Sequence, residues 1–246
     1  ANRMCVRIGG QGRPSEDATA FLTDLATKDA WLGGGVGWVD LRSPVIDGRL
    51  AFWDQHPVVK GYRHQIQDEA DPPLFMADPD FNRGLAFIQR RNLVFEVLIH
   101  SKDLSAATTL CARHDVAQMV LDHLGKPAPG QESLRDWGRR LAPLADLAHV
   151  SCKISGLVTE AAWHKWTEAE LLPFIETAFE LFGPKRVMFG SDWPVCLLAA
   201  SLDEVYRLAE KATDHFSRAE KQDFWGGNAV RIYNIKGVDN GFDAER

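Results

Sequence analysis

The sequence predicts an α/β fold in which parallel strands alternate with helices and close into a barrel. Short runs of apolar and β-branched residues recur along the 246-residue chain, and amphipathic segments separate most of them. Strands that are apolar at nearly every position and alternate with helices are typical of a parallel sheet covered on both faces. Seven such strands in one chain favour a closed barrel over an open sheet.

The elements follow from these patterns in chain order. Amphipathic segments predict helices over 15–29, 79–92, 104–115 and 167–183, with Ser15 and Thr167 as N-caps and Gly183 before Pro184 as the end of the last. The glycines of GGGVGWVD, residues 33–40, do not form a dinucleotide-binding loop, and we interpret them as a tight entry into a strand. The predicted strands lie at 4–9, 34–40, 60–67, 93–99, 117–124, 149–156 and 186–192.

Composition limits the possible classes of protein. The chain is 45% hydrophobic and 25% charged, which is typical of a globular protein, and we expect a single domain over 1–246. Its net charge of −6 is not concentrated in a long block, so no nucleic-acid or membrane partner is expected. No apolar stretch approaches the roughly 18 residues of a membrane span, and the start lacks a secretory signal pattern. We therefore expect a cytoplasmic protein with reduced cysteines.

Polar residues stand at the expected carboxyl ends of several strands, which is where barrel enzymes carry their chemistry. Each has a structural alternative: Asp192 could cap a turn, His123 could be a core histidine, and Arg63 could pair with a nearby carboxylate. Their shared position favours a functional site. Glu96 lies inside an apolar run and receives no assignment. The candidates are Arg63 and His64, then Asp122, His123 and Lys126, then Lys153 and Ser155, and finally Asp192 with Trp193.

This set of side chains suits hydrolysis. Asp192 can accept a proton from water, while an imidazole or a bound metal polarises the carbonyl under attack. Arg63 and Lys126 can hold a substrate carboxylate or stabilise an oxyanion, and Trp193 can cover a sugar-like ring. The sequence has neither the G-x-S-x-G nor the H-E-x-x-H pattern of other hydrolases.

Five segments in this order, GYRHQIQDE, LDHLGKP, CKISGL, FGSDWPVC and NAVRIYNI, resemble the amidohydrolase superfamily. The likeness runs from about Pro14 to Ile235 and is greatest to sugar-lactone hydrolases of the L-fuconolactonase and L-rhamnonolactonase type. It implies a (β/α)8 TIM barrel that opens a lactone ring to a hydroxy acid. It also implies that His123 is the active-site histidine and that Asp192 activates the water. Arg63 and His64 would then face the substrate, and Trp193 would line the pocket.

One motif of that family is missing. Its first strand ends in H-x-H, which this sequence does not contain, and the strand count predicts that the first βα unit is absent and the barrel incomplete at its N-terminus. His123 and Asp192 remain as candidate ligands for a divalent metal, zinc or manganese, whereas a catalytic zinc site usually has three protein ligands. Exposed strand edges at 4–9 and 186–192 predict a homodimer.

Three functions follow. A lactonase acting on a small sugar lactone in carbohydrate metabolism comes first. The alternatives are a related metal-dependent decarboxylase or hydrolase of the same superfamily, which needs a complete metal site, and an inactive truncated barrel.

Overall fold

Seven parallel strands form one curved sheet in the computed structural model, which describes residues 5–8, 15–28 and 31–236. Each strand pairs with the next one along the chain, so every run that the sequence predicted as a strand is confirmed. The strands are β1 (Cys5–Ile8), β2 (Leu32–Gly37), β3 (Val59–His64), β4 (Val94–Val97), β5 (Met119–Leu121), β6 (Val150–Ile154) and β7 (Val187–Phe189).

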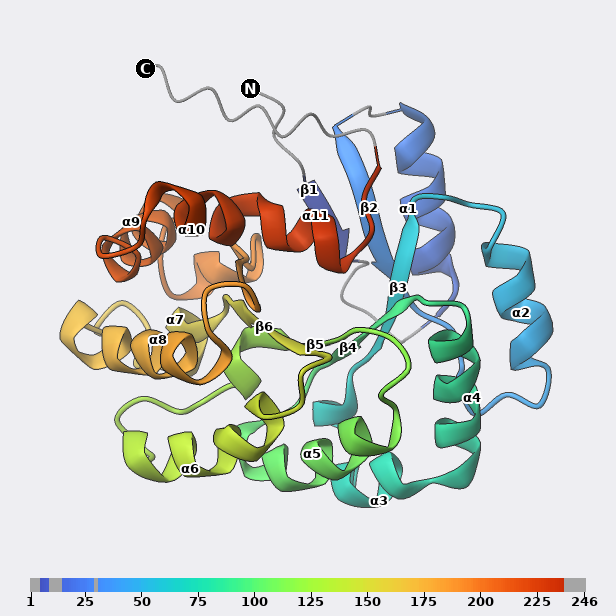
Figure 1. Ribbon diagram of the computed structural model, residues 1–246, viewed down its shortest axis with the longest axis horizontal. Coiled ribbons are helices and arrows are strands. Elements are labelled where there is room, and N and C mark those ends of the chain that lie inside the picture. Colours follow the sequence, from blue (N-terminus) through green and yellow to red (C-terminus); the bar gives the residue numbers. More distant parts are fainter. Residues whose placement is uncertain (1–4, 9–14, 29–30, 237–246) are drawn as a thin grey trace.

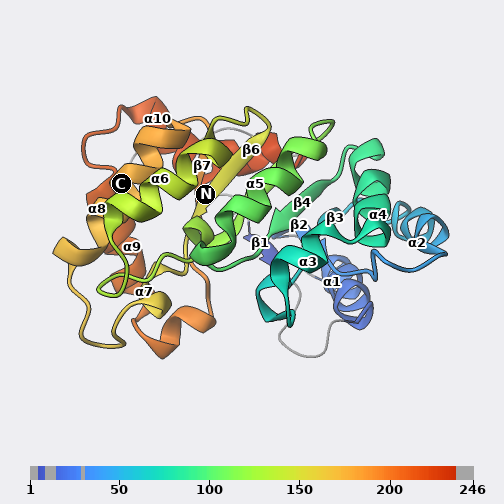
Figure 2. The same ribbon diagram turned by 90° about the horizontal axis from the view of Figure 1, so that it is seen from below.

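Helices cover the outer face of this sheet (Figures 1 and 2). The four predicted helices are confirmed as α1, α4, α5 and α8, and Thr167 caps α8 with a capping box shared with Glu170. Gly183 ends α8 with a φ of 71°, a conformation that glycine adopts without strain. The helices are α1 (Asp17–Lys28), α2 (Ile46–Trp53), α3 (Pro72–Ala77), α4 (Pro79–Arg90), α5 (Leu104–Arg113), α6 (Leu134–Ala145), α7 (Leu157–Glu160), α8 (Glu168–Phe182), α9 (Leu202–Ala212), α10 (Arg218–Gln222) and α11 (Asn228–Ile232).

The interpretation of the glycine-rich segment as a strand entry was wrong. Residues 33–35 lie inside β2, and the strand ends at Gly37, before the predicted end. A Cβ on Gly34 would lie 2.6 Å from Cγ of Lys60, and one on Gly37 would lie 2.5 Å from Oγ1 of Thr19. These two glycines therefore let β3 and α1 pack close to β2.

Residues 232–235, which we call the carboxyl-terminal segment, lie inside the curved sheet. Ile232, Tyr233 and Ile235 are buried there. They pack against one inward-facing apolar residue from each of four strands, namely Val36, Val94, Val120 and Met188. Ile232 belongs to α11, drawn in red in Figure 1, and shares this layer with Val36 of β2 and Met188 of β7. Val94 and Val120 of this apolar layer precede the inward-facing residues Glu96 and Asp122 by two positions along the chain, so the layer lies next to the charged interior.

Within the described ranges, β1 and β7 are the two edges of the sheet and do not pair with each other. Seven strands agree with the predicted absence of the first βα unit of an eight-unit barrel. The homodimer through these edges and the single domain over 1–246 stay predictions. No helix in the described part of the chain is long and apolar enough to cross a bilayer.

Candidate active site

The alternation of side chains along the strands places charged residues inside the barrel. In β4, Val94 and Glu96 point inward, while Phe95 and Val97 belong to the outer core. Arg63 of β3 is the register partner of Glu96, so these two inward-facing residues are neighbours across the sheet. The same alternation applies to Lys153 of β6 and to Asp122, which directly follows β5.

Arg63, Glu96, Asp122, Lys153 and Tyr233 form what we call the buried charge network. Lys153 Nζ lies 2.5 Å from Glu96 Oε1 and 2.9 Å from Asp122 Oδ1. Arg63 donates to Asp122 Oδ2 at 3.0 Å, and the Tyr233 hydroxyl donates to Glu96 Oε1 at 2.5 Å. Two carboxylates thus meet two cations, and the network as a whole is compensated.

Burial and charge act in opposite directions on the carboxyl groups of this network. Burial alone would raise the pKa of Asp122, but the charges of Lys153 and Arg63 hold it well below its ordinary value. Burial raises the pKa of Glu96, and the negative charge of Asp122 adds to that effect. Asp122 is therefore the firmly ionised member of the pair.

His123 and Asp192 lie above the network, on loops that follow β5 and β7. His123 Nδ1 shares a hydrogen bond of 2.8 Å with Ser155 Oγ, and His123 Nε2 lies 3.8 Å from Asp192 Oδ1. Both residues have left-handed backbones, with φ of 52° and 54°. Non-glycine residues seldom adopt that conformation, and it is enriched at functional sites. The structure thus brings together the two residues that the sequence named as catalytic.

The environment sets the charge state of this pair. Burial raises the pKa of Asp192 to about 6; Asp122 and Glu160 add to the shift, while Lys126 and Arg63 oppose it. Burial lowers the pKa of His123 to about 3. At neutral pH, Asp192 is ionised yet unusually basic for an aspartate, and His123 is a neutral imidazole.

A close approach of backbone fixes the His123 ring. Gly156, which follows β6, has a φ of 64°, and a Cβ added to it would lie 2.7 Å from His123 Nδ1. The ring therefore packs flat against the Gly156 backbone while Ser155 holds its Nδ1.

The rim of the site carries an ion pair and an exposed indole. Lys126 Nζ lies 3.0 Å from Glu160 Oε1, and the two side chains are 17% and 19% exposed. Trp193, next to Asp192, is 57% exposed. Lys126 and Trp193 therefore lie where the sequence expected substrate-binding groups.

His64 is engaged differently from the prediction. The indole N–H of Trp38 donates to His64 Nδ1 at 3.3 Å, and an indole N–H can only donate. The ring proton of a neutral His64 must then be on Nε2, which donates to Glu69 Oε1 at 2.6 Å. Burial lowers the pKa of His64 despite Glu69. Both ring nitrogens are thus occupied, and no described contact joins His64 to His123 or Asp192.

The donors do not fit a metal centre. Among the described residues, no group of three or more His, Cys, Asp or Glu side chains is arranged to hold a metal ion. His123 and Asp192 supply two ligands, and the nearby carboxylates of Asp122 and Glu96 are already paired with Lys153. A catalytic zinc ion needs a third protein ligand. His123 and Asp192 as ligands of zinc or manganese therefore stay a prediction, for which the described residues supply two donors and no third.

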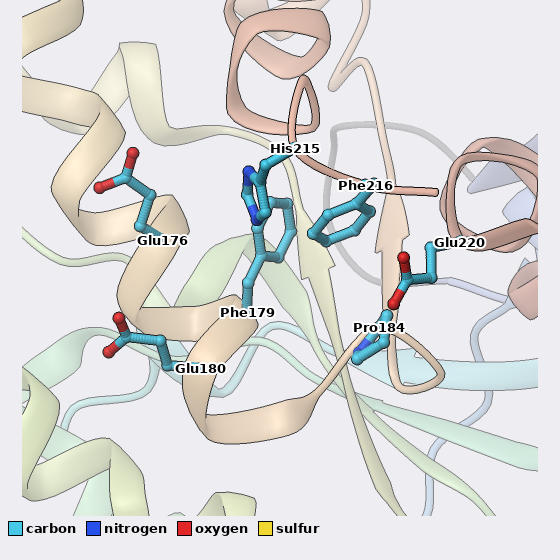
Figure 3. Close-up of a pocket in the computed structure, with 7 residues that line it drawn as sticks. All are labelled: Glu176, Phe179, Glu180, Pro184, His215, Phe216 and Glu220. Carbon is cyan, nitrogen blue, oxygen red and sulfur yellow. The ribbon is translucent and has the colours of Figure 1, made fainter. Parts of the chain in front are cut away.

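A cavity of about 420 Å³ lies at the other end of the sheet, near Pro184, which precedes β7. Figure 3 shows Phe179, His215 and Phe216 gathered in it, while the carboxylates of Glu176 and Glu180 point away from these rings. Barrel enzymes carry their chemistry at the carboxyl ends of the strands, so this cavity is on the wrong side for catalysis.

Comparison with known proteins decides the family. The amidohydrolase family model matches residues 11–235. The chain belongs to the amidohydrolase family. A curated relative, the L-fucono-1,5-lactonase of Burkholderia multivorans, is 46% identical over an alignment of 245 positions that covers 96% of this chain and 82% of that protein.

Other relatives agree with this assignment. An amidohydrolase crystal structure from Burkholderia multivorans, which has bound zinc, superposes with a TM-score of 0.89 at 45% identity and covers 94% of this chain and 83% of that chain. The L-rhamnono-gamma-lactonase of Scheffersomyces stipitis is 24% identical over an alignment of 202 positions that covers 72% of this chain and 60% of that protein. The predicted family and barrel-type fold are confirmed, and the relatives support the predicted hydrolase class.

The sequence did not identify three residues of this site. Glu96 carried a signal, because it is a single charge inside an apolar strand. Tyr233 lies within the recognised NAVRIYNI segment, but nothing local shows that its hydroxyl reaches a residue 137 positions away. Glu160 ends a short helix after β6, and its sequence surroundings give no sign of its partner Lys126.

Proposed function

We propose that this chain hydrolyses the ring ester of a sugar lactone to the hydroxy acid, with Asp192 as the base that activates water. The observation that carries the proposal is the pairing of Asp192 with His123, 3.8 Å apart at the carboxyl ends of β5 and β7. The lactonase relatives support the substrate class.

The reaction requires proton transfer and stabilisation of the charge that develops on the substrate. Asp192 takes a proton from the water while the water oxygen attacks the carbonyl carbon of the lactone. It returns that proton to the ring oxygen when the bond between the carbonyl carbon and the ring oxygen breaks. The other requirement is stabilisation of the negative charge on the carbonyl oxygen. Arg63, whose charge also acts on Asp192, supplies one positive group there.

Neutral His123 supplies a second polarising group. If the Ser155 hydroxyl donates to Nδ1, the proton of the imidazole is on Nε2, which faces Asp192 and the substrate position. Nε2 can then donate a hydrogen bond to the carbonyl oxygen. Trp193 offers an exposed indole face for the sugar ring, and His64 helps to shape the pocket from β3.

No step of this mechanism passes through a metal, since the described donors do not form a metal centre. The lactonase has more support than the metal-dependent decarboxylase because the curated relatives include an L-fucono-1,5-lactonase and an L-rhamnono-gamma-lactonase. The cytoplasmic location and the role in carbohydrate metabolism stay predictions.

Lactone opening releases acid, so a pH indicator follows it directly. We expect the parent chain to hydrolyse L-fucono-1,5-lactone or a related sugar lactone, and Asp192→Asn to lower kcat by about 10²–10⁴-fold. Asparagine tolerates the left-handed backbone of Asp192, so the melting temperature should change little.

The matched control is Asp214→Asn, an exposed aspartate in the turn after α9, and it should leave the rate unchanged. An active parent whose Asp192→Asn variant keeps most of its rate would show that this aspartate is structural. A parent that opens no lactone would favour the inactive barrel.

A further inference from the structure

The ion pair between Lys126 and Glu160 joins two loops at the mouth of the site. Lys126 follows β5, and Glu160 ends α7, the short helix after β6. Both side chains are mostly but not fully buried, and both charges act on Asp192. The pair therefore stands beside the reacting groups and remains within reach of solvent and substrate.

The pair leaves hydrogen-bonding capacity unused. An ammonium group has three donors, and in the described part of the chain Glu160 is the one ion-pair partner of Lys126. The carboxylate of Glu160 has about four acceptor positions, of which Lys126 takes one. Lys126 also has a left-handed backbone, with φ of 50°.

We propose that Glu160 is a specificity-determining residue which, with Lys126, binds the ring hydroxyl groups of the lactone. The inference rests on the proposed lactonase function. A hydroxyl group both donates and accepts, so it matches a carboxylate and an ammonium held 3.0 Å apart. A lactone without hydroxyl groups leaves both charges to be desolvated without new partners, which selects against it.

The test compares two substrates. Rates of acid release are measured for a hydroxylated sugar lactone, L-fucono-1,5-lactone, and for unsubstituted δ-valerolactone, which has the same reacting ester. The readout is the ratio of the two kcat/KM values. Glu160→Gln keeps the shape but loses the charge, and we expect this ratio to fall about 10–100-fold, mainly through KM for the sugar lactone.

Two further variants make the result specific. Glu160→Asp keeps the charge with a shorter reach, and it should restore part of the ratio. Glu176→Gln, an exposed glutamate near the cavity at the opposite end, should leave the ratio unchanged. Thermal melting of each variant shows that it is folded.

The outcomes separate this inference from the proposed function. A parent that is active on sugar lactones, together with a Glu160→Gln ratio equal to that of the parent, would overturn the specificity role alone. An equal fall for both substrates would overturn it too, because Glu160 would then act on the chemistry. A parent that hydrolyses neither lactone would overturn the function and the inference together.

Discussion

The buried charge network and the rim above it contain the same types of side chain in different surroundings. In the network, Glu96 and Asp122 are fully buried and meet Lys153 and Arg63. At the rim, Asp192 and Glu160 keep 15% and 19% of their side-chain surface exposed. Compensated burial fixes geometry, whereas partial exposure leaves groups free to exchange protons and partners. In the proposed reaction, the buried charge network would mainly hold groups in position, with Arg63 also close to the reacting groups, and the rim would bind and convert the substrate.

Two aspartates make this difference concrete. The cations around Asp122 hold its pKa well below the ordinary value, whereas burial raises the pKa of Asp192 to about 6. Environments that drive two carboxyl groups apart in pKa are a sign of divided roles. Asp122 stays a permanent charge that anchors Arg63, and Asp192 is the one able to gain and lose a proton near neutral pH.

Removing Lys153, one of the two cations of the buried charge network, should have the largest effect on stability. Lys153→Met leaves Glu96 and Asp122 buried with Arg63 as the remaining cation, so one negative charge is uncompensated. We expect the free energy of unfolding at pH 7 to fall by about 3–5 kcal/mol, measured by denaturant titration.

The matched substitution at the rim is Lys126→Met. It breaks a partly exposed pair, and the expected loss is about 1 kcal/mol or less. Equal losses for Lys153→Met and Lys126→Met would contradict the distinction between a structural layer and a functional one.

Local sequence pattern predicted the strands and placed His123 and Asp192 at strand ends that the structure brings together, because both depend on local rules. A run such as RVMFG predicts a strand, and a polar residue at its carboxyl end predicts a position in the site. The pattern did not predict what Glu96 does, because its partners come from β3, β6 and the carboxyl-terminal segment. For His64, the substrate-facing role stays a prediction, and the pattern did not predict its partners. Its position agreed with the site, but its neighbours Trp38 and Glu69 take up both ring nitrogens.

The pH dependence of activity sharpens the comparison. If Asp192 is the base, its protonated form is inactive, so kcat/KM should fall roughly tenfold for each pH unit below about 6 and level off above it. Burial keeps the pKa of His123 at about 3, so the imidazole should add no second step near neutral pH. The measurement is lactone hydrolysis across this pH range at constant ionic strength.

Lys126 supplies the sign test for this profile. Its positive charge lowers the pKa of Asp192, so in Lys126→Met the pKa should rise and the acid limb should move to higher pH. Lys211→Met, which removes an exposed cation from α9, should leave the limb in place. A limb that moves to lower pH in Lys126→Met would show that another group controls the rate.

A smaller effect than that of Lys153→Met is expected where the network meets Tyr233. Tyr233→Phe removes the hydroxyl that donates to Glu96 Oε1, while Lys153 still pairs with that oxygen. The ring itself keeps its packing in the apolar layer. We therefore expect a loss of about 1–2 kcal/mol in the free energy of unfolding, the usual contribution of one hydrogen bond to a charged acceptor.

Tyr206→Phe is the control, since Tyr206 is 41% exposed and its hydroxyl should contribute little. The acid limb of the pH profile should stay in place in Tyr233→Phe, because Asp192 is not a contact of this hydroxyl. If the variant were as stable as the parent, apolar contacts of Ile232, Ile235 and the ring at position 233 would be enough to hold the segment inside the sheet. Lys153 and Arg63 would then be the groups that stabilise the Glu96 carboxylate, and the Tyr233 hydroxyl would contribute nothing to the network.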